Sequence, residues 1–72
     1  MKPNIKFGDI LTYSEEWYKA SGQEKPEKPI LFVATGKITE VMPGHYLIYV
    51  VRENRSYAQS YHYSFLEKIN EK

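Results

Sequence analysis

The stretch that decides the fold of this 72-residue chain runs from residue 30 to residue 52 and reads ILFVATGKITEVMPGHYLIYVVR. Apolar, β-branched and aromatic residues fill it on both sides of Pro43-Gly44, and such residues suit a pleated, packed surface. Proline presets the first central angle of a tight turn and glycine supplies the positive φ of the second, so Pro43-Gly44 predicts a hairpin turn. We therefore expect two long strands here, within a small all-β domain.

The alternation of the first of these strands slips, because Ile38 and Val41 are three residues apart rather than two. A bulge or bend near Thr39-Glu40 would reconcile the two halves, and Gly36 gives the backbone room to coil. The second strand, from His45 to Arg52, is apolar on both faces. Either another part of the chain covers its outer face or another chain does.

Turn and cap residues divide the rest of the chain. Gly8-Asp9 predicts a turn before a strand over residues 10–13. Residues 14–29 form a long polar excursion, in which Ser14 can cap one or two helical turns, Gly22 can close them, and an exposed loop follows. We expect a turn at residues 53–56, a strand at 57–63, a 3₁₀ turn or brief last strand at 64–69, and fraying at 70–72.

Composition bounds the class of protein. Seventy-two residues make one domain at most, residues 1–72, and the absence of Cys excludes disulfides and thiolate zinc sites. Ten basic and nine acidic residues give a net charge of +1, without the basic stripe of most nucleic-acid binders. No stretch has the pattern of a secretion signal or approaches membrane-spanning length, so we expect a cytoplasmic protein without membrane contact.

Five short strands are too few for two well-populated sheets, and coiling into a partly open barrel would remove most exposed edges. The segments that set the rhythm of the chain are Gly8-Asp9-Ile10-Leu11, the excursion, Gly36-Lys37-Ile38 with Val41, Tyr46-x-Ile48-x-Val50, and Phe65-Leu66-x-x-Ile69. Over nearly the whole chain this rhythm resembles a Src-homology-3-like barrel, and is most similar to its bacterial and bacteriophage versions. The resemblance implies a small five-stranded, partly open all-β barrel with the excursion between the first and second strands.

The resemblance does not extend to a function, because this barrel hosts many unrelated activities. The eukaryotic peptide-binding members carry an Ala-Leu-Tyr-Asp-Tyr-like opening and a Trp pair, neither of which is present. Proline-rich peptide binding is therefore not carried over. The transcription-factor and ribosomal versions contact RNA through Gly-x-x-Gly loops and basic strands, and this sequence does not match them well either.

The single Trp of the chain, Trp17, lies in the excursion beside Tyr18. Trp is enriched among the residues that dominate protein interfaces, so Trp17 is a candidate anchor for a partner. The simpler interpretation, which we favour, is that Trp17 folds back over the open end of the barrel and plugs the core.

Seven Tyr residues raise a similar choice. A four-residue turn at 53–56 would place on one face Tyr46, Ile48, Val50, Tyr57, Tyr61 and Tyr63. We expect this face to be the core; a stacking platform for nucleic acid would need nearby cations, and the only suitable ones are Lys37, Arg52 and Arg55. The same register puts Tyr49 with Leu47 on the opposite face, together with Ser60, His45 and His62.

Two imidazoles alone make a weak metal site, and Glu40 is the only candidate third ligand, so we favour ordinary strand and turn histidines and predict no metal or cofactor. A catalytic constellation is also missing, since no Cys nucleophile, no recognisable Ser-His-Asp arrangement and no phosphate-cradling Gly loop occur. The sequence therefore predicts a non-enzymatic module that binds a protein partner through Trp17, Tyr18, Leu47 and Tyr49. The alternatives are a nucleic-acid-binding barrel, self-association into a homo-oligomer, or a structural part of a larger assembly.

Overall fold

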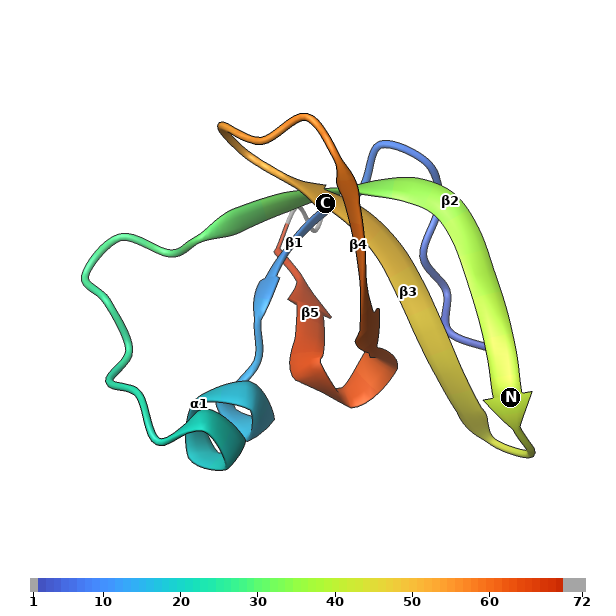
Figure 1. The fold of residues 1–72 in the computed structure, drawn as a ribbon, viewed down its shortest axis with the longest axis horizontal. Coiled ribbons are helices and arrows are strands. Elements are labelled where there is room, and N and C mark those ends of the chain that lie inside the picture. Colours follow the sequence, from blue (N-terminus) through green and yellow to red (C-terminus); the bar gives the residue numbers. More distant parts are fainter. Residues whose placement is uncertain (1, 70–72) are drawn as a thin grey trace.

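The structure, a computed structural model, describes residues 2–69 (Figure 1). Its elements are, in chain order, β1 (Ile10–Tyr13), α1 (Glu15–Ser21), β2 (Leu31–Met42), β3 (His45–Arg52), β4 (Ala58–His62), the 3₁₀ turn η1 (Tyr63–Phe65) and β5 (Leu66–Lys68). Within the described residues the five strands form one antiparallel sheet in the order β4-β3-β2-β1-β5. The predicted all-β class and the five strands are confirmed, but the sheet is not closed into a barrel, because β4 and β5 remain its two edges.

The β2–β3 hairpin follows the prediction. Met42 pairs with His45, so Pro43-Gly44 forms the two-residue turn between them. Gly44 has a φ of 81°, the left-handed region that glycine enters without steric cost. This hairpin is the longest element pair of the sheet and extends to the right in Figure 1.

The irregularity of β2 lies on either side of the predicted place. Thr39 and Glu40 pair regularly with β3, whereas the register shifts between Ala34 and Ile38 and again between Glu40 and Met42. The first shift surrounds Gly36, which has a φ of 93°. A Cβ added to Gly36 would lie 3.3 Å from the Cβ of Phe7, so the glycine also lets the N-terminal segment pass close to the strand. The prediction of a bulge or bend near Thr39-Glu40 agrees with the second shift, which follows Glu40, and the shift around Gly36 is an additional irregularity.

The core lies on one face of the sheet. Its fully buried residues include Leu11, Phe32, Ile48 and Val50, contributed by the three adjacent strands β1, β2 and β3. Tyr46 is buried as predicted, and Tyr61 is partly buried against the core from β4. The edge strand β4 thus adds one aromatic side chain, Tyr61, to a core made mainly of aliphatic side chains.

The predicted burial of Tyr57 and Tyr63 is wrong, since their side chains are 51% and 40% exposed. The strand β4 begins only at Ala58, so Tyr57 lies beyond the sheet, where its hydroxyl accepts a hydrogen bond from Arg55 Nη1 at 2.8 Å. Tyr63 begins η1, which turns the chain away from the strand direction. The β3–β4 register itself is confirmed, because Ile48 pairs with Tyr61.

The excursion contains the predicted helix and loop. α1 ends at Ser21 and is capped by Gly22, which has a φ of 74° and donates its N–H to the Tyr18 carbonyl. Ser14 precedes the helix but makes no side-chain cap; its hydroxyl donates instead to the Ser64 carbonyl, which fastens the helix start to η1. The 3₁₀ turn and the brief last strand, predicted as alternatives for residues 64–69, both occur, and the 3₁₀ turn begins one residue earlier, at Tyr63. The predicted fraying at 70–72 lies outside the described residues.

Candidate functional site

Aromatic rings fix the excursion to the sheet. The ring of Trp17 stacks on Tyr13, with centroids 3.7 Å apart and planes within 9°. Tyr18 meets the same Tyr13 ring edge-on at 6.0 Å. Trp17 is partly buried and packs against the core cluster, so its placement matches the plug that we favoured. The helix is held on the core side of the sheet by this stack.

Tyr13 is the centre of this aromatic cluster. Its ring contacts Phe32 and Tyr61 edge-on, and its hydroxyl shares a 2.9 Å hydrogen bond with the Tyr61 hydroxyl. Burial, followed by that hydrogen bond, raises the pKa of Tyr13 well above its ordinary value of 10. The phenol therefore stays neutral and serves as a link between β1 and β4.

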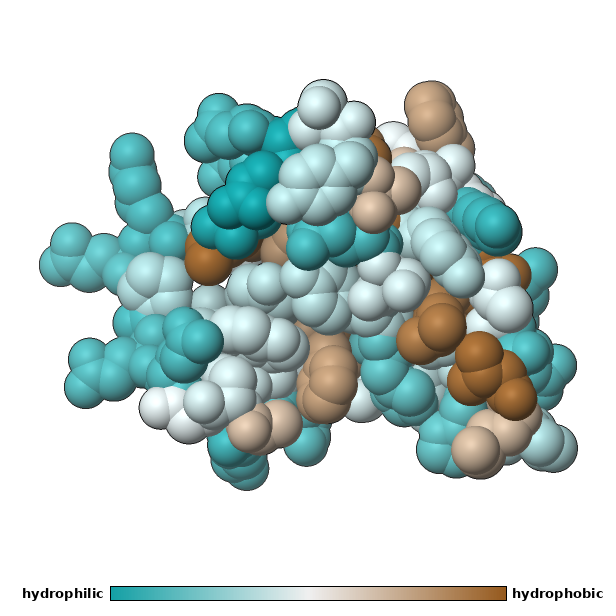
Figure 2. Space-filling view, viewed as in Figure 1, coloured by the Kyte–Doolittle hydropathy of each residue, from teal (hydrophilic) through white to brown (hydrophobic). Residues whose placement is uncertain are grey.

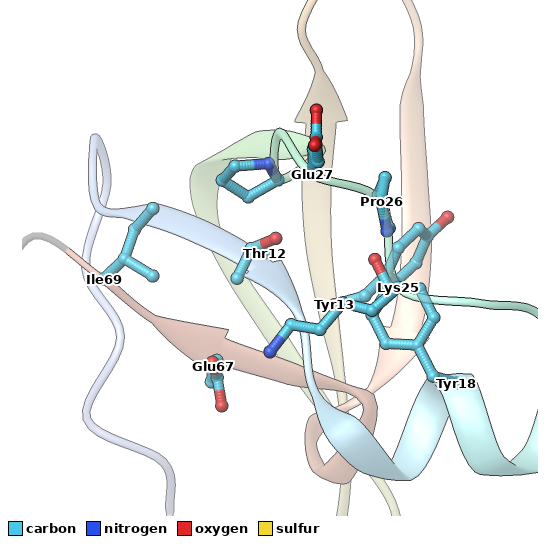
Figure 3. Close-up of a pocket in the computed structure, with 9 residues that line it drawn as sticks. Thr12, Tyr13, Tyr18, Lys25, Pro26, Glu27, Glu67 and Ile69 are labelled. Atoms are coloured by element: carbon cyan, nitrogen blue, oxygen red, sulfur yellow. The ribbon is translucent and has the colours of Figure 1, made fainter.

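A shallow groove opens where the loop of the excursion crosses β1 and β5 (Figure 3). It holds about 220 Å³ and runs from Tyr18 of α1 to Ile69, with Thr12 of β1 between them. Pro26 and Pro29 form the loop side. This volume is below the roughly 300–1,000 Å³ of sites that enclose small molecules, so the groove is too small to surround a substrate of that size.

The outer face of the sheet, opposite the core, carries a row of apolar side chains. Ile10 pairs with Val33, Val33 with Val51, and Val51 with Ala58, so the row crosses β1, β2, β3 and β4 without a polar residue. Val33 is 41% exposed. Leu47 and Tyr49 lie on the same face of β3 and are partly exposed. We call Val33, Leu47, Tyr49 and Val51 the outer patch.

The four residues predicted to bind a partner therefore do not form one surface. Trp17 and Tyr18 pack on the core side, against Tyr13, whereas Leu47 and Tyr49 lie on the outer face. Since α1 is held on the core side, it does not cover the outer patch. The alternation of β3 placed Val51 on one face with Leu47 and Tyr49 from the sequence alone. Val33 was not singled out, although its pairing with Val51 about the hairpin turn contained the signal.

The basic residues of the nucleic-acid alternative are also divided. Lys37 places its Nζ 4.8 Å from the centre of the Tyr49 ring, at the outer patch. Arg52 and Arg55 flank the β3–β4 turn, joined by a hydrogen bond from the Arg55 N–H to the Arg52 carbonyl at 3.0 Å. The structure thus places one cation at the outer patch and two at a turn, rather than along one stripe.

The two histidines are in direct contact on the outer side of β3 and β4. His45 Nδ1 lies 3.0 Å from His62 Nε2, and His62 Nδ1 lies 2.9 Å from Ser64 Oγ and accepts the Ser64 N–H at 3.2 Å. Glu40 is not directed to them, because its carboxylate accepts a hydrogen bond from the Gly44 N–H at 3.3 Å. Over residues 2–69, no group of three or more His, Asp or Glu side chains gathers in a metal-binding arrangement.

The two sides of the molecule in Figure 2 differ in the hydropathy of their surface residues. Hydrophobic surface gathers on the side of the β2–β3 hairpin, where Val41 and Met42 are 51% and 57% exposed, whereas the side of the excursion loop is largely hydrophilic.

In the described part of the chain no helix has the length and apolar character needed to cross a membrane. No protein-family model matches the chain, and no curated protein or solved structure is significantly similar to it.

Proposed function

We propose that this chain is a non-enzymatic, cytoplasmic module that binds another protein through the outer patch. The observation that carries the proposal is that Val33, Leu47, Tyr49 and Val51 share one sheet face that α1 leaves open. Contiguous exposed apolar side chains on a small domain typically mark an interaction surface. The surface is rimmed by polar groups such as Lys37 and Ser60, as protein interfaces commonly are.

The proposal includes a fold of the Src-homology-3-like type. It is supported by the number of strands and by the pairing of β1 with β5, which brings the first and last strands of the described chain together. The proposal that the chain is not an enzyme is supported by the small volumes of the two grooves lined by Tyr18, about 220 Å³ and about 280 Å³. A protein partner is favoured over nucleic acid because the net charge is only +1 and the three candidate cations Lys37, Arg52 and Arg55 are not gathered along one surface.

Site-specific crosslinking tests the proposal. A photoreactive phenylalanine analogue replaces Tyr49 in the outer patch, or Tyr57 as a control that is 51% exposed but lies beyond the sheet. We expect the probe at position 49 to crosslink one protein of the native cell and the probe at position 57 to capture it much less. Crosslinks to nucleic acid, or only to a second copy of the chain, would instead support one of the alternatives.

Binding of the purified partner then measures the contribution of the patch. Val33→Lys should weaken binding at least about tenfold, because a cation replaces an apolar contact at the centre of the patch. The control Tyr57→Ser should leave the affinity within about twofold, as expected for a residue outside the interface. The affinity should change little with salt; a steep decline as salt rises would refute an apolar interface.

A further inference from the structure

The histidine contact carries an inference that is independent of the outer patch. We propose that His45 and His62 bind one first-row transition-metal ion, preferably Cu²⁺, with Met42 beside them as a third ligand. Both imidazoles present a ring nitrogen to the same point between β3 and β4, His45 through Nδ1 and His62 through Nε2. Neutral imidazole nitrogens are the common protein ligands of copper, zinc and nickel.

The separation of the two nitrogens fits a shared ion. Two nitrogens bound at about 2.0–2.1 Å are about 2.9 Å apart as neighbours in a square plane and about 3.3 Å apart in a tetrahedron. The observed separation of 3.0 Å lies between these values. The separation of the two nitrogens therefore suits a shared ion, but both rings must turn to bind it, because in an N–H···N hydrogen bond the acceptor lone pair is directed at the other nitrogen and not at a point beside the line that joins them.

Ser64 supplies the outer support that metal-binding histidines usually have. In the hydrogen-bonded form, His62 Nδ1 accepts the Ser64 N–H, so the proton of the neutral ring is on Nε2, facing His45. When His62 binds an ion through Nε2, that proton moves to Nδ1. Ser64 Oγ, 2.9 Å away, can then accept it, whereas the Ser64 N–H at the start of η1 loses its acceptor, so binding of the ion has to outweigh that lost hydrogen bond.

Met42 enters through the register of the hairpin. It pairs directly with His45 across the Pro43-Gly44 turn, so the two side chains share a face, and Met42 is 57% exposed. A thioether is a soft ligand that selects Cu⁺ and acts as a weak axial ligand of Cu²⁺. Glu40 is the nearest carboxylate considered for this site, but it is engaged with the Gly44 N–H. The ligand set is thus two imidazoles and one thioether, which favours copper over zinc.

The sequence contains two His and no Cys, so no other imidazole and no thiol competes with His45 and His62 for the added ion. CuCl₂ is titrated into the full chain in a calorimeter, and the Cu²⁺-loaded protein is examined by electron paramagnetic resonance. We expect one ion per chain and hyperfine splitting from two nitrogen ligands. Zn²⁺ should bind more weakly than Cu²⁺, in the Irving–Williams order.

Variants identify the ligands. Either His45→Gln or His62→Gln should lose the two-nitrogen signal and weaken binding by about tenfold or more, and Ser64→Ala should weaken it by about 10–100-fold. Urea unfolding without metal checks that each variant is folded. The proposal is overturned if wild type shows no saturable binding, or if the double variant of His45 and His62 binds Cu²⁺ as wild type does. An unchanged affinity in Met42→Leu would refute the thioether ligand.

Discussion

Replacing Trp17 by Ala should destabilise the fold by about 2–4 kcal/mol, because the side chain holds the excursion to the sheet. Trp17 stacks on Tyr13 at 3.7 Å and is partly buried against the core. A buried aromatic side chain removes about 150–250 Å² from water, so partial burial removes roughly 100–150 Å². At about 25 cal/mol per Å², this area contributes about 2.5–4 kcal/mol. The better helix propensity of Ala returns about 0.5 kcal/mol.

Urea unfolding followed by far-UV circular dichroism measures this change in wild type and variant alike. With an m value of about 1 kcal/mol/M for so small a domain, the midpoint should decrease by about 2–4 M. Tyr57→Ala is the control, since this tyrosine lies beyond β4 and is 51% exposed, and it should cost less than about 1 kcal/mol.

The intact protein offers a second measurement at the same position. Trp17 is the only Trp of the chain, so fluorescence quenching by acrylamide reports on it alone. A packed indole should emit at short wavelength and resist the quencher. Ready quenching, together with a loss of less than about 1 kcal/mol in Trp17→Ala, would refute the plug and make Trp17 available to a partner.

Three further substitutions test other parts of the structure by their effect on the urea midpoint, which is measured over a range of pH for Tyr13 and Asp9. Gly44→Val should cost about 1–3 kcal/mol, because Gly44 has a φ of 81° and β-branched residues resist positive φ; an unchanged midpoint would contradict the turn. Burial raises the pKa of Tyr13 in the folded state above the unfolded value of about 10, so wild type should lose stability as the pH rises above 10. In Tyr13→Phe the urea midpoint should decrease less steeply above about pH 10 than in wild type. Equal slopes in the two proteins would refute the contribution of the Tyr13 hydroxyl to this loss of stability. The backbone N–H of Lys6, 2.8 Å from the carboxylate, lowers the pKa of Asp9, so its contribution is present above about pH 4 and lost as the pH falls below it. The urea midpoint of Asp9→Asn should therefore decrease less than that of wild type as the pH falls below about 4. Identical midpoints at every acid pH would count against the hydrogen bond between the Lys6 N–H and the Asp9 carboxylate.

The sequence was most informative where a local rule decides the structure. Pro43-Gly44 predicted the hairpin, and the turn length at residues 53–56 predicted the pairing of Ile48 with Tyr61. Gly22 predicted the end of α1. In each case the decisive residues lie within a few positions of the feature, so backbone preference and spacing were enough.

The errors concern contacts between distant segments. The register shift of β2 around Gly36 was not located from the sequence, and the alternation pattern does not contain the approach of Phe7 to this glycine. Tyr57 alternates correctly with the core residues of β4 but lies one residue before the strand begins. Ser14 has the residue type of a helix cap, yet its hydroxyl donates to Ser64, fifty residues away. The candidate site is divided for the same reason, since the stack on Tyr13 and the bond from Ser14 to Ser64, both between distant segments, place α1 on the core side of the sheet.

The pairing of β1 with β5 has a consequence for the way the chain acquires its fold. Tyr13 pairs with Leu66 and Leu11 with Lys68, so more than 50 residues separate the partners. A hairpin such as β2–β3 closes locally and forms within about 1–10 μs, whereas the β1–β5 pairing must close a loop of more than 50 residues. Contacts between residues so far apart in the chain slow folding, because the entropy of loop closure is lost before the contacts form. Until β5 pairs, one edge of β1 has no strand beside it, so we expect completion of the sheet to be a late step of folding.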